Sequence, residues 1–300
     1  FEPGFDNASG FSEGMAAVKR NGKYGYINKE GKLVIETQFD DALDFSYGLA
    51  VFKNGNKCGY INKEGRIVIE PIFDGSSSFK KNLAPVNIGG TINKDFGFFE
   101  GGKWGYINST GKYVQEIYFD DAASLEDDMA RIVKNGKHGF INKEGAIVIK
   151  PQFDSAGYFS EGLAPVEKNR KYGFIDKQGK FVIKPQFDWA YAFTEGLAVI
   201  VKNRKYGFIN RQGSIVINTQ FTKAECFREG LAPFQKNKKW GYINRDGAVV
   251  IEPVFDYAGL FFEGRAAVNI GGKPDSDYGL FTEGGKWGYI INPLSAKKKK

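Results

Sequence analysis

The segment Lys103-Trp104-Gly105-Tyr106-Ile107-Asn108 decides the fold, because relatives of it recur along nearly the whole chain. In each copy a glycine follows an aromatic or similar residue and precedes an aromatic residue and isoleucine. The eight glycines are Gly25, Gly59, Gly105, Gly139, Gly173, Gly207, Gly241 and Gly288, spaced by 34, 46, 34, 34, 34, 34 and 47 residues. Such a period indicates one small structural repeat copied eight times.

Residues 39–72 represent one repeat. Three runs rich in β-branched and aromatic residues, at 49–53, 58–62 and 66–71, are separated by turns at 54–56 and 63–65. Short runs bounded by Asn, Gly and Lys-Glu-Gly predict antiparallel hairpins. A weaker fourth strand is expected around 42–45. No stretch keeps a period of 3.6 residues, so the helix content should be close to zero.

Glycines mark the turns between these strands. Asn21-Gly22 and Asn135-Gly136 suit a two-residue turn that needs positive φ at both positions. The glycine that closes the second turn suits the left-handed residue of a three-residue hairpin. These glycines are Gly31, Gly65, Gly111, Gly145, Gly179, Gly213 and Gly247.

Proline and alanine indicate how the strands of a repeat are ordered. Proline recurs just after the last strand, which places that strand at a sheet edge, at Pro3, Pro71, Pro151, Pro185 and Pro253. The second strand carries an alanine in every copy, as expected where repeats crowd together: Ala16, Ala50, Ala84, Ala130, Ala164, Ala198, Ala232 and Ala266. This pattern predicts an all-β repeat protein forming a closed β-propeller-like ring of about eight short blades. An open solenoid or superhelix of β-hairpins is the alternative.

The two ends of the chain complement each other. The segment 1–6 aligns with residues 35–40, the tail of a repeat, and residues 287–293 form the third strand of a repeat without its fourth. In a closed ring the first segment could supply the outer strand of the last blade and remove an exposed edge.

Composition excludes several classes of protein. The chain of 300 residues is 42% hydrophobic and 15% aromatic, which is ample for a core, and it has no run of about 18 apolar residues to span a membrane. The net charge is +7, and four of the positive charges belong to the last four residues, Lys297, Lys298, Lys299 and Lys300. The remainder has charges of both signs interspersed, so nucleic acid is not an expected partner. Two cysteines cannot form a disulfide framework.

The motifs resemble those of the bacterial WG repeat, or KWG repeat, family. The resemblance is carried by residues 103–108, their relatives at the other seven sites, and the linking Pro-x-Phe-Asp and Phe-x-Glu-Gly-Leu-Ala segments. It implies one β domain over 1–293, followed by a Lys-rich tail at 294–300, in a protein of bacterial origin. The sequence does not indicate the cellular location of the protein, and a secreted or cell-surface location is one option. Cys58 and His138 depart from the pattern by replacing the aromatic residue before the glycine.

The sequence predicts no catalytic residue, metal site or cofactor. The single histidine, His138, is interpreted as a ring packed among its neighbours. The repeated aspartates are interpreted as turn caps that accept backbone N–H bonds, although a repeated carboxylate could also serve a metal or glycosidase site. They are Asp6, Asp40, Asp74, Asp120, Asp154, Asp188 and Asp256. Asp275-Ser276-Asp277 resembles only the start of a calcium loop.

Two insertions break the symmetry of the array, at about 87–101 and 269–284. Both contain Asn-Ile-Gly-Gly, an Asp-aromatic-Gly and Glu-Gly-Gly-Lys-Trp. Because insertions in repeat folds tend to map to a binding face, these hairpins are the candidate ligand site. The candidate residues are Asn87, Asp95, Phe96, Trp104, Asn269, Asp277, Tyr278 and Trp287.

The expected function is that of a non-enzymatic binding or scaffold module with a protein partner. A carbohydrate-binding surface is the alternative, because exposed Trp and Tyr beside Asn and Asp would suit sugar stacking. The opposing hypothesis is an enzyme, namely a hydrolase that uses two carboxylates about 5–10 Å apart, as glycosidases do. A purely structural spacer is a third possible function. The oligomeric state is not indicated.

Overall fold

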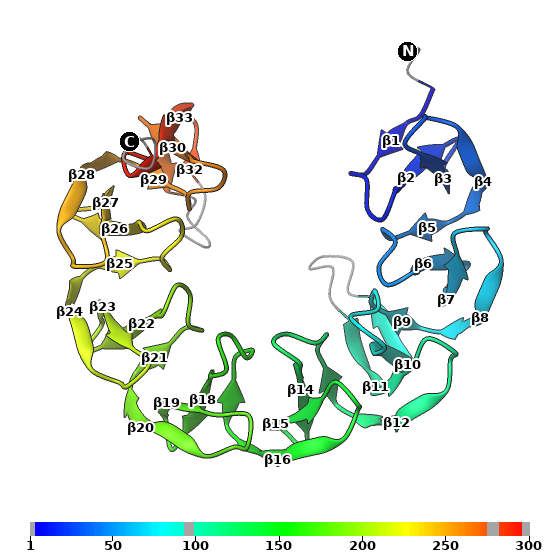
Figure 1. The fold of residues 1–300 in the computed structure, drawn as a ribbon, viewed down its shortest axis with the longest axis horizontal. Helices are drawn as coiled ribbons and strands as arrows, with labels where there is room; N and C mark the ends of the chain where they lie inside the picture. The colour runs from blue at the N-terminus through cyan, green and yellow to red at the C-terminus, as the bar shows by residue number, and fades with distance from the viewer. Residues whose placement is uncertain (1–3, 93–98, 275–281, 296–300) are drawn as a thin grey trace. The chain divides into compact units, whose positions relative to one another are not determined.

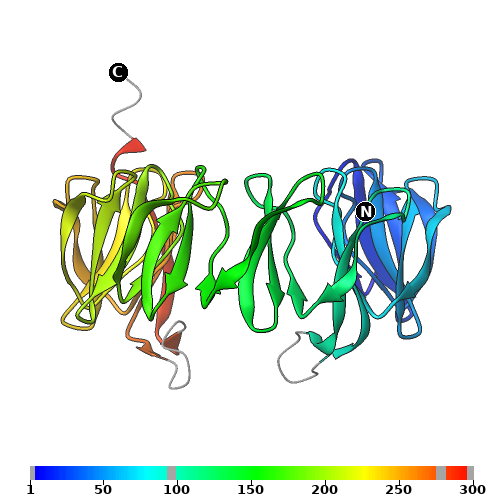
Figure 2. The same cartoon turned by 90° about the horizontal axis from the view of Figure 1, so that it is seen from below.

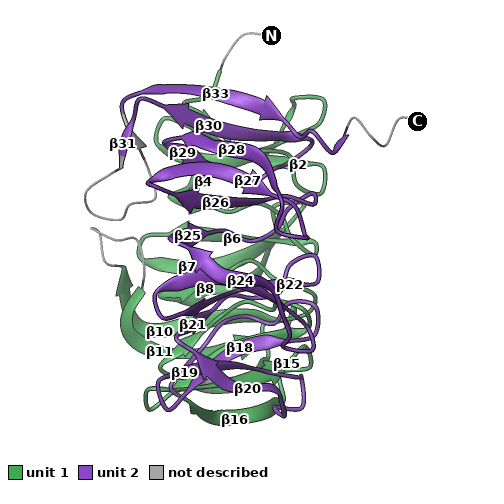
Figure 3. Cartoon of the chain, turned by 90° about the vertical axis from the view of Figure 1, so that its left-hand side faces the viewer, with its two compact units in different colours: residues 1–153 green, residues 154–300 purple. Residues whose placement is uncertain are grey.

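The computed structural model describes residues 4–92, 99–274 and 282–295, and these residues contain β-strands and turns but no α-helix. The chain divides into two compact units, Phe1–Phe153 and Asp154–Lys300 (Figure 3). With no helix in the described ranges, none there is long and apolar enough to cross a membrane. The predicted near-absence of helix is confirmed for the described part of the chain.

The strands of the first unit are β1 (Asn7–Ala8), β2 (Met15–Arg20), β3 (Lys23–Asn28), β4 (Leu33–Phe39), β5 (Asp41–Ala42), β6 (Leu49–Asn54), β7 (Lys57–Asn62), β8 (Ile67–Phe73), β9 (Gly75–Ser76), β10 (Ala84–Ile92), β11 (Phe99–Ile107), β12 (Tyr113–Phe119), β13 (Asp121–Ala122), β14 (Met129–Lys134), β15 (Lys137–Asn142) and β16 (Ile147–Phe153). Those of the second unit are β17 (Ser155–Ala156), β18 (Ala164–Lys168), β19 (Lys171–Ile175), β20 (Phe181–Phe187), β21 (Trp189–Ala190), β22 (Leu197–Lys202), β23 (Lys205–Asn210), β24 (Ile215–Phe221), β25 (Lys223–Ala224), β26 (Ala232–Lys236), β27 (Lys239–Ile243), β28 (Val249–Phe255), β29 (Tyr257–Ala258), β30 (Arg265–Ile270), β31 (Lys273–Pro274), β32 (Thr282–Glu283) and β33 (Lys286–Ile291).

Each repeat forms a small antiparallel sheet whose strands follow in chain order (Figures 1 and 2). The second repeat has the order β5-β6-β7-β8, and six other sheets have the same four-stranded plan. The last repeat contributes the three-stranded sheet β29-β30-β33 and the ribbon β31-β32. The array is therefore all-β with propeller-like blades, as the sequence predicts.

Two details differ from the sequence prediction. The weak first strand is Asp41–Ala42 instead of 42–45, because the chain then turns so that Phe45 enters the core. Pro71 lies inside the outer strand β8, not after it. It is tolerated there because β8 is an edge strand and because a bulge interrupts the pairing between Cys58 and Tyr60 of β7.

That bulge explains the recurring glycine. A Cβ on Gly59 would lie 2.5 Å from the carbonyl oxygen of Ile69 and 2.8 Å from the nitrogen of Pro71. Gly207 meets the same obstacle, since its Cβ would lie 2.7 Å from the carbonyl oxygen of Ile217. The glycine therefore allows the third and fourth strands of a repeat to approach more closely than any side chain permits.

The hydrophobic core lies between successive repeats. Tyr26 of β3 is fully buried and packs against Phe45 of the next repeat, with ring centroids 4.8 Å apart. In the second unit Phe208 packs against Phe227 at 4.9 Å in the same way. Burying one such ring contributes about 1.5–3 kcal/mol. Phe45 and Phe227 therefore belong to the core between neighbouring repeats.

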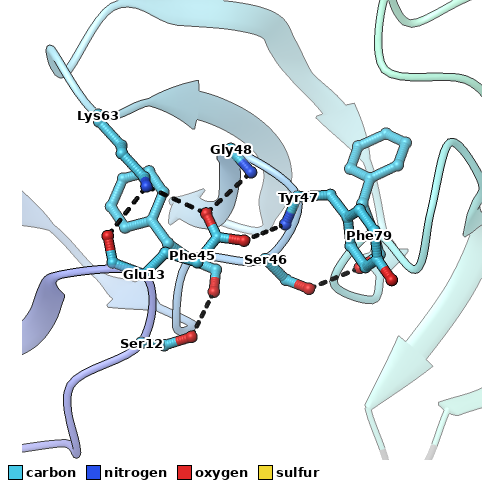
Figure 4. Close-up of polar contacts among 8 residues, drawn as sticks. All are labelled: Ser12, Glu13, Phe45, Ser46, Tyr47, Gly48, Lys63 and Phe79. Carbon is cyan, nitrogen blue, oxygen red and sulfur yellow. Dashed lines mark hydrogen bonds and ion pairs between the residues drawn. The ribbon is translucent and has the colours of Figure 1, made fainter.

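Polar contacts also join the first repeat to the second (Figure 4). The Glu13 carboxylate accepts hydrogen bonds from the backbone N–H groups of Tyr47 at 2.6 Å and Gly48 at 3.0 Å. Both residues have positive φ, so Glu13 holds a strained turn of the following repeat. Ser12 Oγ donates to the carbonyl of Phe45 at 2.7 Å. Lys63 completes the cluster by donating to the Glu13 carbonyl at 2.9 Å.

The repeated aspartates have a structural role as well. Asp188 Oδ2 accepts from the N–H of Asn203 at 2.7 Å, and its Oδ1 lies 2.5 Å from Lys171 Nζ. Asp40 makes the equivalent bonds with Gly55 and Lys23. The hydrogen bonds from Lys171 and from Asn203 hold the pKa of Asp188 below its usual range. The predicted turn-capping role is thus confirmed.

We predict that Gly207→Ala lowers the free energy of unfolding by about 1–3 kcal/mol, because the added methyl group would overlap the Ile217 carbonyl and force β23 and β24 apart. Gly288→Ala is the matched control, since nothing lies within 4 Å of a Cβ at that position. Urea denaturation followed by circular dichroism measures both. Equal stability of the two variants would contradict the steric role of the glycine.

We predict that Asp188→Asn lowers the Tm by about 1–3 °C at pH 7, because it removes an exposed ion pair and weakens a turn cap. Since the folded-state pKa is depressed, this stabilisation is present above the unfolded pKa and is lost as the pH falls through the folded value. The Tm difference from the wild type should therefore shrink below about pH 4. Asp246→Asn, at an exposed turn position, is the control. A pH-independent difference would contradict the prediction.

Candidate functional site

The first insertion lengthens a hairpin of the third repeat. β10 and β11 each have nine residues, where β6 and β7 have six. The extra pairs run from Gly90 opposite Gly101 to Ile92 opposite Phe99. The candidate residues Asp95 and Phe96 lie outside the described residues. The extension therefore projects a two-stranded ribbon from the end of the sheet.

Asn87 shapes the base of this ribbon. Its side chain is fully buried, and its Oδ1 accepts from the Gly90 N–H at 2.9 Å. Gly102 has a φ of +67°, and a Cβ there would lie 2.6 Å from Asn87 Oδ1 and 2.3 Å from the Gly90 nitrogen. Asn-Ile-Gly-Gly and Glu-Gly-Gly therefore belong to one bend. The motif that pointed to a ligand is explained by backbone geometry.

The second insertion repeats the bend. Asn269 is fully buried, accepts from the Gly272 N–H at 3.0 Å and donates to the Gly284 carbonyl at 3.1 Å. Beyond it, β31 pairs with β32 through Lys273 opposite Glu283. The candidates Asp277 and Tyr278 lie outside the described residues. Like Asn87, Asn269 supports its hairpin from inside.

The two candidate tryptophans have different surroundings. Trp104 is 9% exposed and belongs to the core between the third and fourth repeats. Trp287 is 53% exposed and packs on Tyr257, with ring centroids 5.3 Å apart. Of the described candidates, only Trp287 therefore presents a large surface to solvent.

Two small residues, Cys58 and Gly75, which were not among the predicted site residues, make room beside the first ribbon. The Phe99 ring lies over Gly75, whose Cβ would come within 2.7 Å of that ring, and meets Trp104 edge-on at 5.8 Å. Cys58 stands where most repeats have Tyr or Trp. The sequence signal was two small residues, Cys58 and Gly75, upstream of the insertion at about 87–101. Only the fold shows that they are neighbours of Phe99.

A groove results between the second repeat and the ribbon. It consists of two adjoining hollows of about 450 and 290 Å³ that share Lys53, Ile92 and Phe99. The remaining lining residues are Asn56, Asp74, Gly90 and Thr91 in the larger hollow, and Asp41, Ala42, Leu43, Val51, Cys58 and Ser76 in the smaller one. We call the apolar lining residues, such as Ile92 and Phe99, the floor of the groove and the polar ones, such as Lys53 and Asp74, its rim.

The charged rim is partly neutralised. Asp74 lies 2.7 Å from Lys57 and accepts the Gly89 N–H at 2.8 Å. Although burial raises the pKa of Asp74, the Lys57 and Gly89 hydrogen bonds outweigh it and hold that pKa below the usual range. Burial also raises the pKa of the Cys58 thiol, which therefore behaves as a small apolar side chain at neutral pH.

The β10 strand gives the groove a second feature. In the described part of the chain, β9 pairs with β10 only at Val86 and Asn87. No described strand therefore pairs with the outer edge of β10 from Ile88 to Ile92, the segment that borders the groove. Such an edge can accept an added strand from another molecule.

The second unit carries a separate aromatic cluster. Trp189 of β21 is 46% exposed and packs at a tilt against Tyr172, with ring centroids 4.7 Å apart. Tyr191, 42% exposed, lies 6.3 Å from Trp189. Trp189 was not among the predicted site residues, because it occupies a column where the other repeats have unrelated side chains.

The described residues offer little for acid–base or metal chemistry. No group of three or more His, Cys, Asp or Glu among them could hold a metal ion. Burial first, and Arg131 second, lower the pKa of His138, which is half-buried opposite Phe153. Burial raises the pKa of Glu225, and the charge that opposes this shift is Lys223, not a second carboxylate. Asp275 and Ser276 lie outside the described residues.

Several solved structures are similar to this chain. A crystal structure of a eukaryotic initiation factor superposes with a TM-score of 0.52 at 12% identity, over 84% of this chain and 77% of that one. Citrobacter koseri AztD has a TM-score of 0.44 at 12% identity, over 82% of this chain and 85% of that one. Kluyveromyces lactis Hsv2p has a TM-score of 0.42 at 6% identity, over 97% of this chain and 99% of that one. The first supports the propeller-like fold and nothing about activity. A search of curated proteins finds no match to this sequence.

The family comparison matches the repeats themselves. The WG containing repeat matches residues 1–24, 24–58, 59–91, 104–137, 139–172, 172–206, 206–240 and 240–273. These matches leave out much of the two inserted ribbons, and after the first match each runs from the third strand of one sheet into the next sheet. The resemblance inferred from the glycine motif is therefore confirmed, and the chain belongs to the family of proteins built from WG containing repeats.

Proposed function

We propose that the protein is a non-enzymatic binding or scaffold module that takes a protein segment in the groove beside the first ribbon. The observation that supports this proposal is the combination of an apolar floor and a strand edge in one place. Ile92 and Phe99 provide the floor, and β10 from Ile88 to Ile92 provides the edge. An extended peptide can use both, with its backbone along the strand and an alternate side chain in the hollow.

The dimensions of the groove fit such an occupant. Its larger hollow of about 450 Å³ lies within the range of ordinary ligand pockets, of about 300–1,000 Å³. Lys53 and Asp74 at the rim can orient a polar peptide flank. The repeats supply a rigid support, because their aromatic residues are buried between neighbours. Binding without catalysis is favoured because the repeated carboxylates have structural hydrogen bonds.

We predict that Ile92→Asp weakens peptide binding at least about tenfold while the protein stays folded, because it places a charge on the apolar floor. A displayed library of random peptides, selected on the wild-type protein, provides the probe. Isothermal titration of a selected synthetic peptide then measures its affinity for each variant.

The control is Val182→Asp, which changes a similarly exposed aliphatic residue on an outer strand of the second unit. Ile92 is 43% exposed and Val182 is 47% exposed. If the wild type and both variants bound the peptide equally well, the groove would not be its binding site. Failure of the library to yield any binder would contradict peptide recognition altogether.

A carbohydrate is the second candidate ligand, favoured by the exposed rings of Trp189 and Tyr191, which lie beside the buried Tyr172. Flat aromatic faces that are partly open to solvent suit the apolar faces of sugar rings. This cluster lies on a different repeat from the groove, so the two candidate functions can be tested separately.

We predict that Trp189→Ala lowers the affinity for any sugar found on a glycan array at least about tenfold, because it removes the largest ring of the cluster. Isothermal titration calorimetry with that sugar measures the change. Tyr47→Ala is the control, since Tyr47 is 57% exposed in the other compact unit. An array without hits would remove the carbohydrate candidate.

A further inference from the structure

One position in the second unit lacks a carboxylate that joins neighbouring repeats elsewhere. Asp188 bridges the fifth and sixth repeats, since its Oδ1 lies 2.5 Å from Lys171 Nζ and its Oδ2 accepts the Asn203 N–H at 2.7 Å. The same pair of contacts, to a lysine and to a backbone N–H, recurs at Asp40, Asp74 and Asp256. Between the sixth and seventh repeats the equivalent residue is Thr222. A neutral side chain therefore stands where the repeat pattern has a negative charge.

Thr222 keeps the backbone position of the aspartates that it replaces. Its N–H donates to the Gln235 carbonyl at 3.3 Å, as the Asp188 N–H donates to the Val201 carbonyl at 2.9 Å. The Thr222 hydroxyl donates to the same Gln235 carbonyl at 2.8 Å, so it is directed at its own sheet. The two contacts that a carboxylate makes elsewhere are therefore left unmade, although the backbone is paired in the same way.

Lys205 is the first group that the substitution leaves without a carboxylate. It precedes Thr222 by 17 residues, as Lys171 precedes Asp188. The Lys205 side chain is exposed, and within the described part of the chain its ammonium group has no hydrogen bond or ion pair. An ammonium group thus lies ready for an anion at this position.

The turn Asn237-Lys238 supplies the second group. Its residues have φ values of 52° and 62°, and the equivalent turn Asn203-Arg204 has 52° and 61°. In that equivalent turn, Lys171 first and then both backbone N–H groups lower the pKa of Asp188. Successive N–H groups in such a turn form a concavity that binds anions. No acceptor for the Asn237 N–H is found among residues 4–92, 99–274 and 282–295.

Positive charge collects around this gap. Three successive turns of the second unit each hold three basic residues, and the gap lies between the second and the third of these turns. The basic residues are Lys168, Arg170 and Lys171, then Lys202, Arg204 and Lys205, then Lys236, Lys238 and Lys239. The neighbouring carboxylates of Asp188 and Asp256 already pair with Lys171 and Lys239. The excess of positive charge raises the local concentration of anions from outside.

We propose that the gap beside Thr222 binds a carboxylate from another molecule, namely an Asp or Glu side chain in an acidic segment of a partner protein. One carboxylate oxygen accepts the Asn237 N–H and the other pairs with Lys205, as Asp188 does with Asn203 and Lys171. A carboxylate fits better than a phosphate, because the site offers the contacts that a single aspartate side chain satisfies in the other repeats. Such charge-assisted hydrogen bonds are stronger than neutral ones.

Fluorescence anisotropy with fluorescein-labelled hexaglutamate tests this proposal at low ionic strength, where exposed charges are least screened. The wild type should bind hexaglutamate and not labelled hexaglutamine. Thr222→Asp fills the gap with an internal carboxylate, and Lys205→Gln removes the ammonium group. Each should weaken the affinity for hexaglutamate at least about fivefold.

Gln212→Glu is the matched control, because it adds the same charge as Thr222→Asp. Gln212 is exposed and lies in the turn after β23, whereas Lys205 begins that strand. This variant should bind hexaglutamate like the wild type. Thr222→Asp should keep the wild-type Tm or exceed it, because aspartate is the residue that the same backbone carries in the other repeats.

An NMR titration with sodium acetate locates the bound carboxylate. The backbone amide resonances of Asn237 and Lys238 should shift saturably in the wild type and stay in place in Thr222→Asp. A parallel titration with inorganic phosphate compares the two anions at the same site.

Four results would overturn the proposal. A wild type that does not bind hexaglutamate is the first, and a Thr222→Asp variant that binds it as tightly as the wild type is the second. The third is an equal loss of affinity in Gln212→Glu, which would mean that net charge alone governs binding. The fourth is saturation of the Asn237 shift at a lower concentration of phosphate than of acetate, which would assign the site to a phosphate ligand.

Discussion

The packing of a phenylalanine from one repeat against the third strand of the repeat before it is the interaction on which the structure depends. A repeat of about 34 residues is too small to enclose a core of its own. Tyr26 reaches zero exposure only because Phe45 of the next repeat covers it. Each repeat is thus completed by its neighbour, which makes the array nearly one-dimensional in its energetics.

This dependence explains why most recurring residues are unavailable for chemistry. The glycine of the motif gives space to a neighbouring backbone, the aspartates cap turns, and Glu13 holds the strained turn at Tyr47 and Gly48. Charged groups that look like a row of candidate catalysts in the sequence are therefore engaged in joining repeats. Variation is left for positions outside these contacts, such as Cys58, Gly75 and the two ribbons.

The sequence alone determined the repeat, the strand order and the turns with good accuracy, because these follow from local rules. Asn21 and Gly22 have the positive φ values that their turn requires, and the alanines of the second strand are buried. The candidate site was less predictable. Asn87 and Asn269 are polar residues in an insertion, which suggested a ligand. Whether such an amide faces solvent or a backbone bend depends on the path of the paired strand.

What only the tertiary structure decided is which distant residues meet and which surfaces remain open. Cys58 and Phe99 are separated in sequence but line one groove, and Trp104 and Trp287 share a motif but differ in exposure. The local pattern specifies what each strand presents on its two faces. Burial also depends on the neighbour that packs against that face, and local sequence rules do not show how closely the two surfaces meet.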